Sequence, residues 1–170
     1  MSISRRAEFE KQLQSGELPE ITEATIESML WGLVGQAPDF AREMAMEVWK
    51  ILRPQHSDLK TNNPFRIGRR VILGWYCERA WSGTKFRVNY HRQKELHAID
   101  GVFHLLDGKG PIKTYTGPLE TAIQIASDGQ GETDYFQFKC WKNHNLHLEF
   151  KRLDLVKELN LLATGEHVIG

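Results

Sequence analysis

The 170 residues include 41% hydrophobic and 26% charged side chains, and 22 basic residues balance 22 acidic ones. This composition is typical of one globular domain, and it excludes a disordered chain and a uniformly basic nucleic-acid coat. The apolar runs are too short to cross a bilayer, and the N-terminal residues lack the apolar stretch of a secretory signal. We expect a single domain over residues 1–170, in the cytoplasm and away from membranes, with Cys77 and Cys140 as buried thiols.

Residues 1–53 have the apolar spacing of amphipathic helices. A first helix is expected to end near Leu13, and a second to begin at Thr22, whose hydroxyl can cap it. A third helix is predicted from Pro38 to Leu52, because apolar side chains recur there every three or four residues. Pro54 then ends this helical N-terminal part.

Residues 60–170 are predicted to form an α+β part. Phe65 to Cys77 alternates loosely and is expected to be a strand, and Lys85 to Tyr90 alternates cleanly as its partner. Helices are predicted from Arg92 to Leu106 and from Leu119 to Ser127, where apolar side chains share one face and glycines follow.

The C-terminal part is predicted to be a β-hairpin over residues 133–150 that leads into a helix over residues 153–163. A three-residue loop, Asn143 to Asn145, would pair Cys140 with Leu148 and would put the apolar side chains of both strands on one face. Such a loop needs a residue in the left-handed conformation, and we expect this residue to be Asn145.

On the polar face, this register would place Trp141 opposite His147 and Lys139 opposite Glu149. The predicted fold is therefore α+β, with an antiparallel sheet, N-terminal helices packed on it, and a C-terminal β-hairpin followed by a helix.

Charge is distributed unevenly along the chain. Residues 1–50 carry 5 basic and 9 acidic side chains, residues 51–113 carry 12 and 5, and residues 114–170 carry 5 and 8. A basic centre between acidic ends could attract an anionic ligand such as a phosphate backbone. If the termini fold back on the centre, the charges intermix instead.

The densest basic and amide-rich stretch runs from Lys60 to Arg70. Arginine and asparagine side chains suit phosphate and base-edge contacts, and Trp75, Tyr76 and Trp81 nearby could stack on bases. The alternative is an edge strand that its arginines keep soluble.

Two histidines and two aspartates recur along the predicted helix of residues 92–106 and its end. Their spacing places His97, Asp100, His104 and Asp107 in one stripe, which could hold a divalent cation or could pair a histidine base with an orienting carboxylate. A partly solvated helix edge is the alternative, and we favour it because no metal-binding signature is present.

Four stretches together resemble a domain family without an assigned activity that occurs in bacteria, phages and plasmids. Some of its members are fused to DNA methyltransferases or encoded beside them. The stretches are FEKQLQSGELPEITEA from Phe9, KTNNPFRIGRR from Lys60, LDGK from Leu106, and FKCWKNHNLHLEFKRLDLVKELN from Phe138. Family members usually have glycine where this chain has His144.

The resemblance implies a mobile-element setting in a bacterial host cell and a link to DNA. It also favours the polar residues of these stretches over His97 and His104, which lie outside them. Two of them also have a structural interpretation: Asn145 could serve the hairpin loop, and Asp154 could cap the last helix.

Three hypotheses follow. The first is a nucleic-acid-associated accessory protein that binds DNA or RNA, with Trp141 and His147 as a stacking surface. Its candidate contacts are Lys60, Asn62, Arg66, Arg70, Trp141, Lys142, Asn143 and Asn145.

The second hypothesis is an enzyme that acts on nucleic acid or a nucleotide. His147 would be its acid or base, Asp107 a charge partner or metal ligand, and Lys109 an anion clamp. The third is a protein-binding module that antagonises a host defence complex or partners a methyltransferase through the acidic N-terminal third. The sequence points to no particular cofactor.

Overall fold

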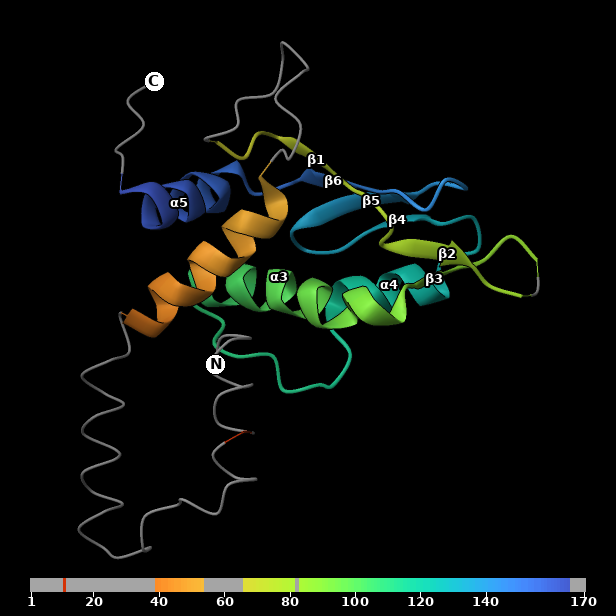
Figure 1. The fold of residues 1–170 in the computed structure, drawn as a ribbon, viewed down its shortest axis with the longest axis horizontal. Helices are drawn as coiled ribbons and strands as arrows, with labels where there is room; N and C mark the ends of the chain where they lie inside the picture. The colour runs from red at the N-terminus through yellow and green to blue at the C-terminus, as the bar shows by residue number, and fades with distance from the viewer. Residues whose placement is uncertain (1–10, 12–38, 54–65, 82, 166–170) are drawn as a thin grey trace, which may run out of the picture.

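The computed structural model describes residues 11, 39–53, 66–81 and 83–165, and Figure 1 shows their arrangement. A helix over residues 39–52 comes first. Then follow β1 (Arg70–Leu73), β2 (Cys77–Arg79), β3 (Phe86–Val88) and the short 3-10 helix η1 (Tyr90–Arg92). The remaining elements are α3 (Gln93–Leu106), α4 (Pro118–Ile125), β4 (Gln130–Glu132), β5 (Phe136–Cys140), β6 (Leu146–Phe150) and α5 (Leu153–Thr164).

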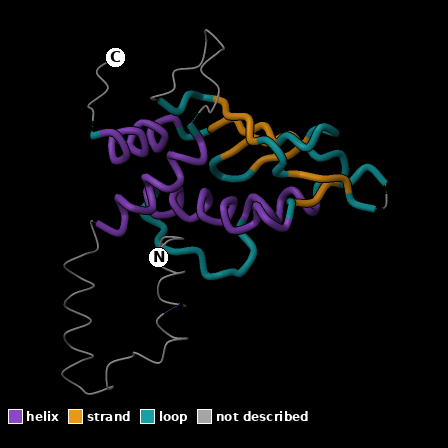
Figure 2. Tube along the Cα trace, viewed as in Figure 1, coloured by secondary structure: helices purple, strands orange, loops and turns teal. Residues whose placement is uncertain are grey.

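The strands form two antiparallel sheets. The larger has the order β1-β6-β5-β4, and the smaller pairs β2 with β3. Figure 2 shows the helices gathered on one side and the strands on the other. The predicted α+β fold, with a hairpin followed by a final helix, is confirmed.

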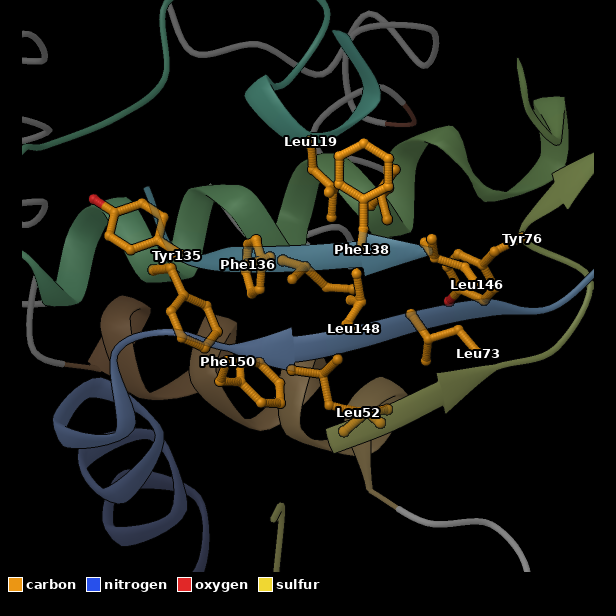
Figure 3. Close-up of a cluster of buried hydrophobic side chains, with 14 of the residues drawn as sticks. Leu52, Leu73, Tyr76, Leu119, Tyr135, Phe136, Phe138, Leu146, Leu148 and Phe150 are labelled. Atoms are coloured by element: carbon orange, nitrogen blue, oxygen red, sulfur yellow. The ribbon is translucent and has the colours of Figure 1, made fainter. Parts of the chain in front are cut away.

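The core lies between the larger sheet and the helices. Phe103 of α3 stacks on Phe150 of β6 and meets Phe136 of β5 edge-on. Leu52 and Leu119 enter the same cluster from the helix of residues 39–52 and from α4 (Figure 3). These side chains are fully buried, and each such side chain contributes about 1.5–3 kcal/mol to folding.

Three predicted helices are confirmed close to their expected bounds, namely those of residues 39–52, α3 and α4. Each carries its buried side chains at helical spacing, as Leu96, Ile99 and Phe103 do in α3. The first two predicted helices fall almost entirely outside the described residues. None of the described helices is both long and apolar enough to cross a membrane.

The predicted strand from Phe65 to Cys77 is wrong as a single element. β1 ends at Leu73, the chain turns at Gly74 and Trp75, and β2 then begins in the other sheet. Val71 and Leu73 point into the core, but the consecutive Tyr76 and Cys77 are both buried. In one continuous strand, Trp75 would share the buried face of Leu73 and Tyr76 would face away, but Trp75 is exposed and Tyr76 is buried, so the chain bends at Gly74 and Trp75.

The hairpin register is also corrected. Cys140 pairs with Leu146 and Phe138 with Leu148, and the three-residue loop spans 142–144. The loop has the predicted length but lies one residue earlier, which moves the pairing by two residues. A two-residue shift leaves every side chain on its predicted face, so the hydrophobic pattern could not detect it. Lys139 therefore lies opposite His147, not Glu149.

The left-handed residue of the loop is His144, with a φ of 70°, and not Asn145. Its carbonyl oxygen accepts hydrogen bonds from the backbone N–H groups of Tyr76 and Cys77, at 3.0 and 3.2 Å. These bonds tie the loop to the turn between β1 and β2. The residue that makes this contact is therefore the one in the left-handed conformation.

We expect His144→Gly to unfold at a higher urea concentration than His144→Ala. Both variants lose the imidazole, but only glycine adopts a positive φ without steric cost, so the difference should be about 1 kcal/mol. Urea denaturation of the two proteins measures it. Equal stability of the glycine and alanine variants would show that the left-handed backbone at His144 carries no strain.

Candidate functional site

The larger sheet has one face that points away from the core, and we call it the outer face. Because Val71, Leu148 and Phe138 are buried, their neighbours along the strands point to the opposite side. The strand register sets these neighbours side by side in two rows. The outer face comprises Arg70, Ile72, Gln130, Glu132, Gln137, Lys139, Trp141, His147 and Glu149.

Three outer-face side chains contact one another near the hairpin loop. The ring centroids of Trp141 and His147 are 5.3 Å apart, and Lys139 Nζ lies 4.4 Å from the Trp141 centroid. Partial burial and the Lys139 charge both lower the pKa of His147. The imidazole is therefore neutral at pH 7, and it presents an aromatic surface without a charge of its own.

Two arginines lie at the β1 edge of the outer face. The Nε atoms of Arg69 and Arg70 donate to the two carboxylate oxygens of Glu149, at 3.0 and 2.7 Å. These contacts lower the pKa of Glu149, so its carboxylate stays ionised. Both arginine side chains remain mostly exposed, at 69% and 76%. A guanidinium has five N–H donors, so Glu149 orients these groups without exhausting them.

A second aromatic pair lies beside the hairpin loop. Trp75 and His144 stack with their centroids 4.8 Å apart and their planes 9° from parallel. The indole of Trp75 is 64% exposed. Of the predicted stacking residues Trp75, Tyr76 and Trp81, Tyr76 is buried in the core.

Asp107 and Lys109, two of the predicted catalytic residues, lie in another cluster at the end of α3. Lys109 Nζ is 3.1 Å from both Asp107 Oδ2 and Asp134 Oδ2. Tyr135 donates its hydroxyl proton to Asp107 Oδ2 at 2.9 Å, and Arg152 Nη1 donates to Asp107 Oδ1 at 2.9 Å. No sequence pattern predicts Tyr135 and Arg152 as partners of Asp107, because they lie 28 and 45 residues along the chain from it.

The charges of this cluster neutralise one another. Hydrogen bonds from Lys109, Tyr135 and Arg152 lower the pKa of Asp107. Hydrogen bonds to Tyr135, Asp134 and Asp107 raise the pKa of Lys109, and those to Asp154 and Asp107 raise the pKa of Arg152. All three groups therefore keep their ordinary charge states at pH 7. Asp107 is held as a paired carboxylate and Lys109 as a paired ammonium, which is the arrangement of a structural ion-pair network.

The sheet separates His147 from this cluster. α3 packs on the core side through Phe103, whereas His147 belongs to the outer face. The three residues of the enzyme hypothesis, Asp107, Lys109 and His147, are therefore not gathered around one space.

Among the other predicted contacts, Lys60 and Asn62 lie outside the described residues. Arg66 is half-buried ahead of β1, and Lys142 is exposed in the hairpin loop. Asn143 Oδ1 accepts a hydrogen bond from Asn145 N at 3.3 Å, so Asn143 takes part in shaping the loop. The Asn145 carbonyl accepts from Trp141 N.

The His and Asp stripe of α3 does not form a metal site. Asp100 is 1% exposed, and its Oδ2 accepts a hydrogen bond from the backbone N–H of Leu119 at 2.9 Å. It thus holds the first turn of α4. Within the described ranges, no three His, Cys, Asp or Glu side chains are grouped to hold a metal ion.

An open groove of about 610 Å³ runs beside the Asp107 cluster. The 114–116 loop, α4 and the chain from Glu132 to Tyr135 line it, together with His104. Asp134, on its rim, is already paired with Lys109. Glu132, a second carboxylate of the lining, is paired with Lys151. The groove therefore combines hydroxyl and apolar surface with two carboxylates whose charges are compensated.

Residues 1–168 match the model of a family described as a domain of unknown function, DUF4942. The chain belongs to this family. No curated protein and no solved structure matched it.

In this DUF4942 domain, two residues of the stretches that carried the resemblance have structural roles. Asn160 Oδ1 accepts from Trp49 Nε1 at 3.1 Å and from Ile67 N at 2.9 Å, and its Nδ2 donates to the Ile67 carbonyl at 3.1 Å. It thereby joins α5 to the helix of residues 39–52 and to the segment before β1. Asp154 lies in the first turn of α5 and pairs with Arg152, so it supports that helix without occupying the cap position.

Proposed function

We propose that this DUF4942 domain binds nucleic acid on the outer face of its larger sheet. The observation that carries the proposal is the contact of Trp141 and His147 with Lys139 on that face. Trp141 is 41% exposed, so its indole remains accessible to a base. Aromatic side chains that bases can stack on, set among cations, are what nucleic-acid-binding sheets present.

The charge of this surface supports the same proposal. Three cations, Lys139, Arg69 and Arg70, lie on or beside this face, which carries two carboxylates, Glu149 and Glu132. Exposed Lys142 adds a fourth positive charge in the hairpin loop. The zero net charge of the whole chain therefore does not describe this face, where phosphates would meet an excess of positive charge.

The test is fluorescence anisotropy with labelled single-stranded DNA, single-stranded RNA and duplex DNA at several salt concentrations. We expect binding to at least one probe, with an affinity that falls steeply as salt rises. Lys139→Gln should reduce the slope of log affinity against log salt by about 1, because one phosphate contact is lost. Lys157→Gln, at an exposed position of α5, is the matched control and should leave the slope unchanged. If no probe binds at low salt, the proposal fails.

The setting proposed for this activity is that of an accessory protein of a phage or other mobile element. It rests on the stretches from Phe9, Lys60, Leu106 and Phe138 that carry the family resemblance. The link to DNA methyltransferases rests on the same resemblance.

A further inference from the structure

We infer that the outer face takes a single strand of DNA or RNA in preference to a duplex, and that Trp75 is a base-stacking platform of this site. The inference rests on the proposed function and adds the form of its ligand. The backbone conformations of Trp75 and His144 support it first.

Trp75 and His144 are the two non-glycine residues with positive φ in the described part of the chain, at 64° and 70°. Left-handed backbone is unfavourable for a bulky side chain, and residues held in it occur often at functional sites. These two residues stack on each other, 4.8 Å apart and nearly parallel. The fold thus holds two unfavourable backbone conformations at the positions that build one aromatic stack.

The stack leaves the indole available to a ligand. His144 covers one face of the Trp75 ring, and the residue is still 64% exposed. A base can therefore stack on the opposite face of an indole whose orientation His144 has already fixed. The Trp141–His147 pair adjoins the same loop along the chain, because residues 142–144, which include His144, connect Trp141 to Asn145.

The width of the sheet disfavours duplex DNA. The major groove of B-DNA admits a two-stranded ribbon, whereas the larger sheet has four strands, each about 4.8 Å from the next. The β5–β6 hairpin does not act as a separate ribbon, since the His144 carbonyl holds its loop to Tyr76 and Cys77. Bases inside a duplex cannot reach Trp75 or Trp141, but the unstacked bases of a single strand can.

The experiment compares the full chain with labelled single-stranded DNA, single-stranded RNA and a duplex of the same sequence at one salt concentration. We expect one or both single strands to bind at least about tenfold more tightly than the duplex, since stacking on two aromatic pairs is open only to them. Duplex binding that equals or exceeds both single strands would overturn the inference while leaving nucleic-acid binding intact. Absence of binding to all three would overturn the proposed function as well.

Trp75→Gly tests the platform without destabilising the turn, because glycine accepts a φ of 64° readily. We expect this variant to melt near the wild-type temperature and to bind the single strand about tenfold more weakly. Trp75→Phe, which retains a ring, should recover part of that affinity. Tyr115→Gly is the matched control and should bind like the wild type, since Tyr115 is 96% exposed in the 114–116 loop beside α4. If Trp75→Gly bound the single strand with wild-type affinity, Trp75 would not be part of the binding site.

Discussion

Asn160→Ala is expected to lower the free energy of unfolding by about 3 kcal/mol, because it leaves one buried donor, one partly buried donor and one buried acceptor without their partner. The lost partners are Trp49 Nε1, Ile67 N and the Ile67 carbonyl, all within 3.1 Å of the amide. Alanine favours a helix interior more than asparagine does, by several tenths of a kcal/mol, so the substitution would otherwise stabilise α5. A large loss would therefore come from the three hydrogen bonds.

Urea denaturation of the full chain measures this effect, and Glu158→Ala is its matched control. Glu158 is exposed on α5 two residues earlier, and its replacement should change stability by less than about 0.5 kcal/mol. Asn160→Asp retains an acceptor but removes the donor to Ile67 and places a carboxylate at a site that is 2% exposed. We expect it to be destabilised too. If Asn160→Ala were as stable as Glu158→Ala, the amide would not join α5 to its neighbours.

Asp100→Asn is expected to remove a fall in stability that the wild-type protein undergoes between about pH 4 and pH 7. The pKa of Asp100 is raised from 3.8 to about 7. Burial is the main cause, the charge of nearby Glu120 adds to it, and the hydrogen bond from Leu119 N opposes it. Because the folded protein binds this proton more tightly than the unfolded chain, the stability contribution is complete below about pH 4. It is lost as the pH rises through 7.

The full contribution follows from the difference of about 3 pH units between the two pKa values, at 1.36 kcal/mol each, and is roughly 4 kcal/mol. Asparagine mimics the protonated acid and keeps an oxygen for Leu119 N. It also brings an NH₂ group to a place where Asp100 Oδ1 has no hydrogen-bond partner in the described structure, at a cost of about 1–3 kcal/mol. We expect Asp100→Asn to exceed the wild type by about 2 kcal/mol at pH 8.

Urea denaturation at about pH 4.5, 6 and 8 would measure this difference in the free energy of unfolding, because these values cover the range between the unfolded and folded pKa values of Asp100. His97 lies near the same atoms, since a Cβ at Gly117 would meet both Asp100 Oδ2 and His97 Nδ1 within 3.3 Å. Asp128→Asn, at an exposed position, should follow the wild type throughout. If the stabilities of Asp100→Asn and of the wild type changed with pH in the same way, Asp100 would be ionised in the folded protein over this pH range.

The amino-acid sequence by itself determined which face of β5, β6 and α3 is buried. The alternation in β5 and β6 and the helical spacing of Leu96, Ile99 and Phe103 in α3 were sufficient, because side-chain direction follows from local backbone geometry. The polar face of the hairpin, with Trp141 and His147, was therefore predictable before any tertiary contact was known.

Only the tertiary structure decided the hairpin register and the partners of the candidate residues. Pairings two residues apart satisfy the same hydrophobic pattern, and the backbone bonds of His144 to Tyr76 and Cys77 accompany the one that forms. Asp107 meets Arg152 across 45 residues of chain, a contact that no local pattern encodes. The stack of Trp75 on His144 arises in the same way, because two turns distant in sequence are brought together by the packing of β1 against β6.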